Sequence, residues 1–210
     1  MHTHVDFFKN TDVEVHFRPW ISRNLIRNYR LQKLSRKFGK KSFVVNKNNN
    51  LIVPAHLFNV VHVLHHIYWY FLVEGVGLRQ VLDLYFLSIN NRNSDIIVII
   101  KRLSMFKFTS AVMWVLMEAF GFNKEFLPCK PNQKEDRFLL SEILKAGNLG
   151  HYDVRENHVI YESRISTFFY WINHSLRLSK HYPIEVFWTP IGIIYISIRG
   201  RFISWLAKVV

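Results

Sequence analysis

A carboxylate and an imidazole near the start of the chain are the residues best placed to do chemistry. Glu14 and His16 are separated by one residue in a segment where apolar and polar residues alternate. This alternation predicts a β-strand, on which residues two apart share a face. A carboxylate beside an imidazole can bind a metal ion or transfer a proton. The solvated polar face of an edge strand would give the same pattern, and the pattern alone favours that simpler interpretation.

Two further imidazoles, His62 and His66, are four residues apart in a segment with the apolar pattern of a helix. Two histidines one helical turn apart can hold a divalent metal ion when a third ligand comes from elsewhere. The helix motif of a metalloprotease is missing, because Val63 rather than glutamate follows His62. The pattern therefore favours a polar seam between helices, in which His66 could pair with Asp83 of the next helix.

The charge of the chain favours an anionic partner. Lys and Arg number 28 and Asp and Glu 15, which gives a net charge of +13. Residues 17–47 contain ten of the basic residues and no acidic one. Within them Arg23, Arg27 and Arg30 share one face of a helix that we expect to end near Gly39. That face could bind RNA or another polyanion, line the phosphate side of a nucleotide site, or simply be solvated.

The elements that must position these residues are a small β part followed by helices. We expect a β-hairpin before Pro19, the basic helix, and a second hairpin at 43–45 and 51–53. Seven helices are predicted after it, at 54–73, 78–89, 94–105, 110–120, 134–145, 160–178 and 192–208. The predicted fold class is α+β, mostly α: an N-terminal β element with the basic helix (1–53) and a helical bundle (54–210).

Several classes of protein and site are excluded or disfavoured. The single cysteine, Cys129, forbids an internal disulfide and a cysteine-based zinc site within one chain. The only Gly-x-Gly, at residues 75–77, follows a predicted helix and lacks a third glycine, so it is not a dinucleotide-binding loop. The most apolar stretches, 60–73 and 191–198, are interpreted as buried helix rather than membrane spans. With no signal peptide at the start, we expect a cytoplasmic protein with no membrane partner.

Three segments together resemble a bacterial family described as uncharacterised nucleotidyltransferases, within the polymerase β-like superfamily. The first is Val13-Glu-Val-His-Phe-Arg-Pro19. The second begins at Phe58-Asn-Val-Val, continues through His66-Ile-Tyr68 and ends with Glu74-Gly-Val-Gly-Leu-Arg-Gln-Val-Leu-Asp83. The third is Gly147-Asn-Leu-Gly150. The resemblance spans nearly the whole chain, and its most specific part is the segment from Glu74 to Asp83.

The resemblance implies metal-dependent transfer of a nucleotide from a nucleoside triphosphate to an acceptor, which is RNA, a protein or a small molecule. In the family, three carboxylates on a small sheet hold Mg²⁺, and Glu14 matches the third of them. The first hairpin would then be a remnant of a nucleotidyltransferase sheet. The resemblance implies a catalytic role for His16 beside Glu14, and substrate contacts from Arg18, His66, Arg79 and Asp83.

One departure from the family changes the expectation for this chain. The family's other two carboxylates lie in an Asp-x-Asp that follows a Gly-Ser turn, and these 210 residues contain neither motif. We therefore expect a chain truncated ahead of its third carboxylate strand, inactive alone, with its catalytic half in a separate segment or polypeptide. The alternatives are a non-catalytic basic module that binds RNA or another polyanion, and a helical partner subunit.

Overall fold

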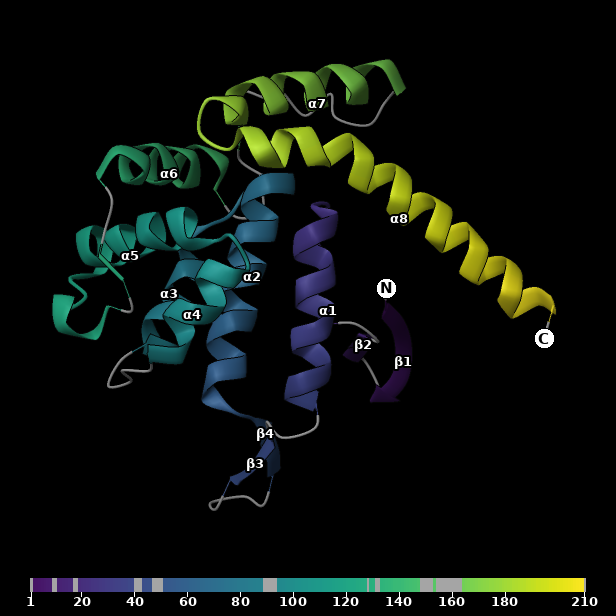
Figure 1. Cartoon of the computed structure of the whole chain (residues 1–210), viewed down its shortest axis with the longest axis horizontal. Helices are drawn as coiled ribbons and strands as arrows, with labels where there is room; N and C mark the ends of the chain where they lie inside the picture. Colours follow the sequence, from purple (N-terminus) through teal and green to yellow (C-terminus); the bar gives the residue numbers. More distant parts are fainter. Residues whose placement is uncertain are drawn as a thin grey trace.

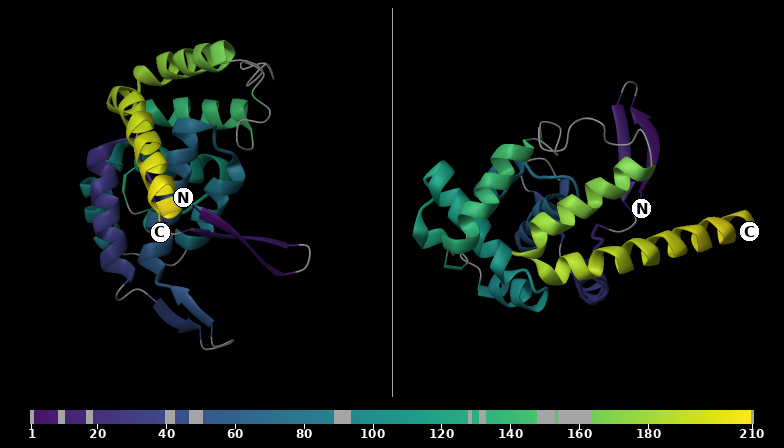
Figure 2. Two further views of the ribbon diagram at one scale, coloured as in Figure 1. Left: turned by 90° about the vertical axis from the view of Figure 1, so that its right-hand side faces the viewer. Right: turned by 90° about the horizontal axis from the view of Figure 1, so that it is seen from above.

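The protein is described by a computed structural model, drawn in Figures 1 and 2. The structure describes the backbone of residues 2–8, 11–16, 19–39, 43–46, 51–88, 94–127, 129–130, 133–147, 153 and 164–209. Side chains are described for residues 19–38, 54–88, 95–127, 129–130, 135–147, 153 and 172–202. Within these residues the chain is mostly helical, which confirms the helical part of the predicted fold class.

The described part of the chain contains eight α-helices. They are α1 (Leu25–Gly39), α2 (His56–Val73), α3 (Leu78–Ser88), α4 (Ser94–Arg102), α5 (Phe106–Phe120), α6 (Gln133–Ala146), α7 (Arg164–Ser179) and α8 (Pro183–Val209). A short 3₁₀ helix, Lys124–Phe126, follows α5. Several bounds agree with the sequence prediction: α1 ends at Gly39, and α6 spans the helix expected at 134–145.

Four short strands form two antiparallel hairpins in the described backbone. The strands are β1 (His2–Phe8), β2 (Thr11–His16), β3 (Phe43–Asn46) and β4 (Leu51–Pro54), paired β1 with β2 and β3 with β4. The register of the first pair sets Glu14 opposite His4 and His16 opposite His2. The side chains of β1 and β2 lie outside the described residues, and the origin of this hairpin in a nucleotidyltransferase sheet stays a prediction.

Helix α2 lies between α1 and the group formed by α3, α4 and α5 (Figure 1). Its Tyr68 and Phe71 contact Phe108 of α5, with ring centroids 4.5 and 5.3 Å apart. Phe71 also contacts Tyr182, just before α8, at 5.4 Å. Every residue from Phe108 to Met113 is buried, so this part of α5 is enclosed on all sides. These aromatic contacts join α2, α5 and the start of α8 in one core.

Trp20 attaches the segment before α1 to α2. It is 1% exposed, stacks on Phe58 with a centroid distance of 5.0 Å, and meets the edge of Phe38 at 6.2 Å. Its indole N–H donates to His62 Nδ1 at 3.0 Å. A buried tryptophan contributes a large apolar area and needs a partner for its N–H, and this site supplies both. Residues on both sides of the predicted domain boundary, between residues 53 and 54, therefore pack in the same core.

The segment that most resembles the nucleotidyltransferase family forms the corner between α2 and α3. Gly75 has a φ of 105°, in the range that favours glycine, and its N–H donates to the Tyr70 carbonyl at 2.7 Å. The N–H of Gly77 donates to the side-chain oxygen of Gln80 at 3.1 Å, which satisfies a backbone donor at the start of α3. The Gly-x-Gly thus connects two helices, in agreement with the rejection of a dinucleotide-binding loop.

The boundary between α4 and α5 differs from the prediction. Helix α4 ends at Arg102 rather than Met105, and α5 begins at Phe106 rather than Ser110. The chain turns at Ser104, which has a positive φ of 56°. No glycine or proline marks this turn, and Met105 is buried in the core, so the apolar pattern continues across it. The local sequence therefore contains no signal for the break.

The prediction that Pro183 and Pro190 separate the last two helices is wrong at Pro190. Helix α8 runs unbroken from Pro183 to Val209 and contains Pro190. A proline inside a helix removes one backbone hydrogen bond and clashes with the carbonyl four residues earlier, which costs about 3 kcal/mol. Glu185 and Gly192 are buried on either side of Pro190 and hold both parts of the helix against the body. This packing offsets the cost.

The prediction that residues 191–198 form a buried helix is also wrong. Ile194 and Ile198 are 59% and 64% exposed. Beyond its packed beginning, α8 extends away from the other helices (Figures 1 and 2). No helix in the described ranges is both long enough and apolar enough to span a lipid bilayer.

The close approach of α8 to the segment before α1 gives a test of the fold. A Cβ at Gly192 would lie 2.5 Å from Arg23 Cα and collide with the Arg23 carbonyl oxygen. We expect Gly192→Ala to lower the free energy of unfolding by about 1–3 kcal/mol, because backbone must move. A Cβ at Gly200 would meet no heavy atom within 4 Å. The matched control Gly200→Ala should raise the free energy of unfolding by up to about 1 kcal/mol.

Denaturant unfolding of the two variants, followed by circular dichroism, measures both effects. Equal stabilisation by the two alanines would show that α8 does not rest against Arg23.

Candidate functional site

The structure describes only some of the side chains that the sequence analysis selected as candidate site residues. Glu14, His16 and Arg18 have side chains outside the described residues, so their predicted roles stay predictions. His66 is exposed on α2, and Arg79 and Asp83 are exposed on α3. Their substrate contacts and the pairing of His66 with Asp83 also stay predictions.

A row of rings runs along one face of α2. Phe58, His62, His66 and Tyr70 follow one another at four-residue spacing, with successive centroids 5.9, 6.0 and 4.5 Å apart. Trp20 donates to His62 Nδ1, so the proton of a neutral His62 is on Nε2. His62 thus belongs to the contact between α2 and the segment before α1, as expected for a polar seam. Among the described side chains, no group of three or more His, Cys, Asp or Glu is placed to hold a metal ion.

The predicted arginine face, which could bind a polyanion, line a nucleotide site or be solvated, is buried at its central residue. Arg27 is only 2% exposed and binds Glu185, which is 158 residues away in the sequence. Arg23 is half-buried, with its guanidinium carbon 5.6 Å from the centroid of the Trp69 ring. Arg30 alone is exposed, and it donates to a backbone carbonyl at the end of α4 at 2.7 Å. Arg23 precedes α1, so only the other two belong to that helix. Helical spacing could not reveal that the central arginine is buried.

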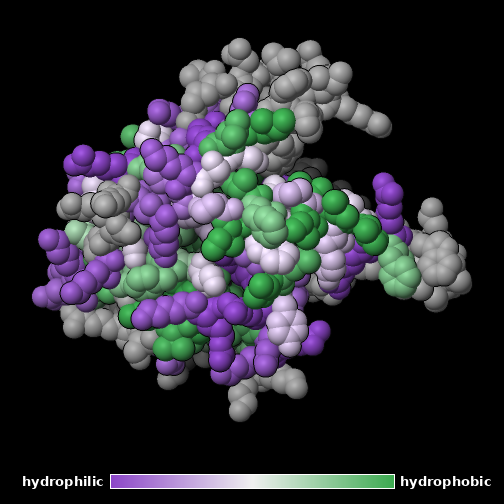
Figure 3. Space-filling view, turned by 45° about the horizontal axis from the view of Figure 1, so that its top comes forward, coloured by the Kyte–Doolittle hydropathy of each residue, from purple (hydrophilic) through white to green (hydrophobic). Residues whose placement is uncertain are grey.

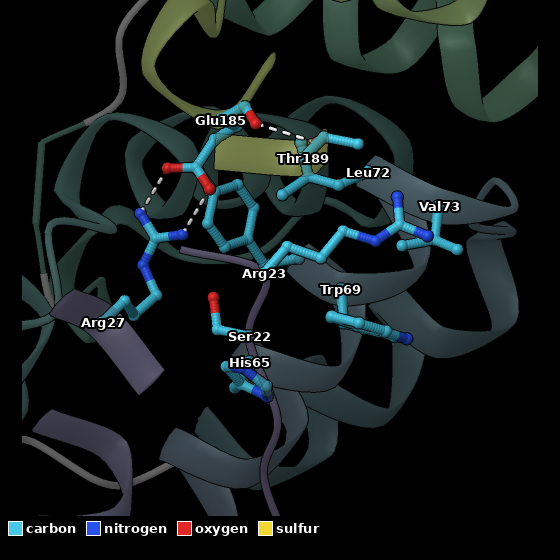
Figure 4. Close-up of a pocket in the computed structure, with 10 residues that line it drawn as sticks. Ser22, Arg23, Arg27, His65, Trp69, Leu72, Val73, Glu185 and Thr189 are labelled. Atoms are coloured by element: carbon cyan, nitrogen blue, oxygen red, sulfur yellow. Dashed lines mark hydrogen bonds and ion pairs between the residues drawn. The ribbon is translucent and has the colours of Figure 1, made fainter. Parts of the chain in front are cut away.

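The Arg27 guanidinium joins three parts of the chain, and Figure 4 shows its contact with Glu185. Its two terminal nitrogens each donate to one oxygen of the Glu185 carboxylate, and both distances are 2.6 Å. Its Nε donates to the Leu103 carbonyl at 2.7 Å and Nη2 donates to the Ser104 carbonyl at 3.3 Å. The guanidinium carbon lies 4.8 Å from the centroid of the Tyr68 ring. Helix α1, the turn between α4 and α5, and helix α8 therefore meet at one side chain.

The surroundings of this pair are strongly desolvated. Burial acts to lower the pKa of Arg27, but Tyr68 and Glu185 outweigh it and the pKa lies above its ordinary value. Burial raises the pKa of Tyr68. Burial, helped by the charge of Arg27, lowers the pKa of His65 to about 3, although a hydrogen bond with the Ile21 backbone opposes the shift. At neutral pH, His65 is therefore uncharged and Arg27 is charged.

The cavity beside the pair is small. It lies between α1, α2 and α8 and is lined in part by Ser22, Arg23, His65 and Trp69 (Figure 4). Its volume is about 10 Å³, about the minimum that one water molecule requires. With both carboxylate oxygens of Glu185 bound by Arg27, this arrangement is a structural joint between helices and not a pocket for a nucleotide.

A second group of charged side chains lies between α6 and α7, near the α2–α3 corner. Arg177 Nε is 3.1 Å from Glu142 Oε2, and Arg177 Nη2 donates to His174 Nδ1 at 2.9 Å. The His174 proton is then on Nε2, which donates to the Leu72 carbonyl at 3.1 Å. Asp153 and Glu74 line the same cavity, whose volume is also about 10 Å³. These contacts hold α7 against the end of α2.

Sequence reasoning missed the partner of Arg27. Glu185 is the only acidic residue between Pro183 and Val209 in a helix of mainly apolar residues. A lone carboxylate in such a helix is a signal of a buried ion pair, because an unpaired buried charge is rare. The sequence contains no signal that would have selected Arg27, among so many basic residues, as its partner.

The described residues offer two surfaces to other molecules. The second half of α1 exposes Lys33, Arg36 and Lys37, and α8 exposes apolar side chains. Comparison of the chain with protein-family models, with curated proteins and with solved structures finds no match.

The buried pair gives a test by double substitution. We expect Arg27→Met to lower the free energy of unfolding by about 3–5 kcal/mol, because the Glu185 carboxylate is left buried without its partner. The double variant Arg27→Met/Glu185→Met should recover most of that loss, since neither charge remains. Arg30→Met is the matched control and should change stability by less than about 1 kcal/mol, because Arg30 is exposed.

Urea unfolding of the wild-type chain, Arg27→Met, Glu185→Met and the double variant gives the coupling energy between Arg27 and Glu185. Additive losses in the double variant would contradict the assignment of a tightly coupled pair.

Proposed function

We propose that this chain is the helical part of a polymerase β-like nucleotidyltransferase, and that Glu14 supplies one of its three metal-binding carboxylates. The other two would come from a segment outside these 210 residues, in the same or a separate polypeptide. In this proposal the chain alone does not transfer nucleotides. Arg18, His66, Arg79 and Asp83 are its candidate substrate contacts, and His16 assists Glu14.

The observation that carries the proposal is that the segment from Glu74, which resembles the family, lies close to Ala146, the residue directly before a second segment that resembles it. Glu74, Gly75 and Val76 line the same cavity as Ala146, which directly precedes the segment from Gly147 to Gly150. Val76 and Ala146 are seventy residues apart, so their approach depends on the folding of α2, α6 and α7 together. Such an approach is expected if the resemblance reflects one folded unit rather than separate chance matches.

The residues present do not by themselves fit a magnesium site. Mg²⁺ prefers oxygen ligands arranged as an octahedron, and Glu14 is the one carboxylate here that matches the family's set. The proposal therefore assigns the Mg²⁺ ligands to the complete protein and assigns Glu14 only a share in them.

The neighbouring DNA sequence and a nucleotide-transfer assay test this proposal. The DNA upstream of the Met1 codon should encode a segment with Gly-Ser and Asp-x-Asp, and its absence there and in neighbouring genes would contradict the proposal. The purified chain should transfer no label from any of the four radiolabelled nucleoside triphosphates in the presence of Mg²⁺. Once combined with that segment, the protein should label an acceptor, and Glu14→Gln should reduce the rate about 100-fold or more, or about 2.7 kcal/mol.

The matched control is Glu118→Gln, which removes an exposed carboxylate from α5 and should leave the rate unchanged. Transfer by the chain alone, or full activity of Glu14→Gln in the combined protein, would contradict the proposed role.

A second function is favoured by the exposed bases of α1. Lys33, Arg36 and Lys37 lie on the half of α1 that does not contact Glu185, and all three are exposed. With Arg27 buried, these three are among the basic residues of the run at 17–47 that remain available to a polyanion. Each phosphate contact adds affinity that falls as salt rises, because bound counterions are released. We propose that this surface binds RNA or the phosphates of a nucleotide.

Fluorescence anisotropy with a labelled single-stranded RNA tests this second function. The triple variant Lys33→Gln/Arg36→Gln/Lys37→Gln should weaken binding and flatten the plot of log affinity against log salt by about 2, since three contacts at about 0.7 each are lost. The control Lys124→Gln/Lys130→Gln/Lys145→Gln removes three exposed charges elsewhere. Equal effects of the two triple variants would contradict a specific surface on α1.

A further inference from the structure

Helix α8 exposes a long row of large apolar side chains. Five residues of this helix are each between 58% and 65% exposed: Ile184, Phe187, Ile194, Ile198 and Phe202. Their spacings of three, four or seven residues place them along one side of a helix. Figure 3 shows hydrophobic side chains gathered where α8 leaves the body of the molecule. Contiguous apolar surface of this kind marks a site of interaction.

The apolar surface covers more than one side of α8. Ile193, Ile194 and Tyr195 are consecutive and are 40%, 59% and 38% exposed. Consecutive helical residues differ in direction by about 100°, so these three span about 200° of the helix circumference. A helix that lies on a membrane surface needs a broad polar face opposite its apolar one. A helix that is apolar on most sides fits a groove that encloses it within a protein.

The charges on α8 indicate what kind of protein would enclose it. Arg199 and Arg201 lie between Ile198 and Phe202. The only carboxylate of the helix, Glu185, is already bound by Arg27. A second copy of α8 would bring the same cations and no free carboxylate, on a chain with a net charge of +13. A groove with acidic groups at its rim would instead complement both arginines.

We propose that the surface of α8 formed by Ile184, Phe187, Ile194, Ile198 and Phe202 docks into an apolar groove of a different protein, whose rim carries carboxylates for Arg199 and Arg201. The proposal rests on the exposure and charge of α8 and does not depend on nucleotidyl transfer. The first part of the helix is fixed to the body through Glu185 and Gly192. The exposed part is therefore presented in a defined direction, which reduces the ordering that binding requires.

Site-specific photocrosslinking tests the proposal in the native host. The full chain carries p-benzoylphenylalanine at Ile194, with a control chain that carries it at Leu144, an exposed apolar position on α6. A protein crosslinked only from position 194 is then purified and titrated with the uncrosslinked chain. We expect one-to-one binding that weakens at least tenfold with Ile194→Asp, weakens with added salt, and weakens with Arg199→Glu. Leu144→Asp should leave the affinity unchanged, and circular dichroism confirms that all variants fold.

Three outcomes would overturn the proposal. A crosslink from position 194 to another copy of the chain, with a dimer in sedimentation equilibrium, would make this surface a self-association site. Sedimentation with vesicles of phosphatidylcholine and phosphatidylglycerol that is lost in Ile194→Asp would make it a membrane contact. Absence of any protein crosslink from position 194, or binding unaffected by Ile194→Asp and Arg199→Glu, would show that the surface docks no such partner.

Discussion

The ion pair between Arg27 and Glu185 is the contact on which the arrangement of the helices depends. It joins α1 to α8 and fixes both to the turn between α4 and α5 through the Leu103 and Ser104 carbonyls. A buried ion pair compensates the loss of hydration only when its geometry is close and its other hydrogen-bonding groups are satisfied. Arg27 meets this condition with two short bonds to one carboxylate and two bonds to backbone oxygens. Two segments from opposite ends of the sequence are thus held together by a polar contact inside an apolar core.

The sequence predicted the helices better than their contacts. The ends of α1 and α6 could be located because glycines at 39 and 147 and charges in the flanking turns mark them. The start of α5 could not, because the turn at Ser104 uses a positive φ at a residue that normally avoids it. At Pro190 the sequence predicted a break that the structure does not contain, because burial on either side of this proline outweighs its local penalty in a helix. Tertiary packing decided both cases.

The candidate site was predictable only in part for the same reason. The spacing of His62 and His66 correctly placed two rings on one face of α2, and the contact of His62 with Trp20 fits the predicted seam. The spacing of Arg23, Arg27 and Arg30 predicted one helical face open to a polyanion, a nucleotide or solvent, but Arg23 precedes α1 and Arg27 is buried. Which side of a helix is buried depends on residues such as Glu185 that are distant in the sequence. The spacing of residues within one helix contains no information about such distant partners.

The division of α8 into a packed beginning and an exposed continuation separates stability from interaction. Glu185 and Gly192 contact α1 and the segment before it, so they are unavailable to any partner. Beyond residue 192 the exposed apolar residues add little to the stability of the isolated chain, because water still covers them. Large apolar side chains that do not stabilise their own fold gain their favourable energy only when another surface covers them. The same argument applies to Lys33, Arg36 and Lys37, whose charged side chains are on the exposed side of α1 and take no part in its buried contacts. For this reason our proposals assign partners to these two surfaces.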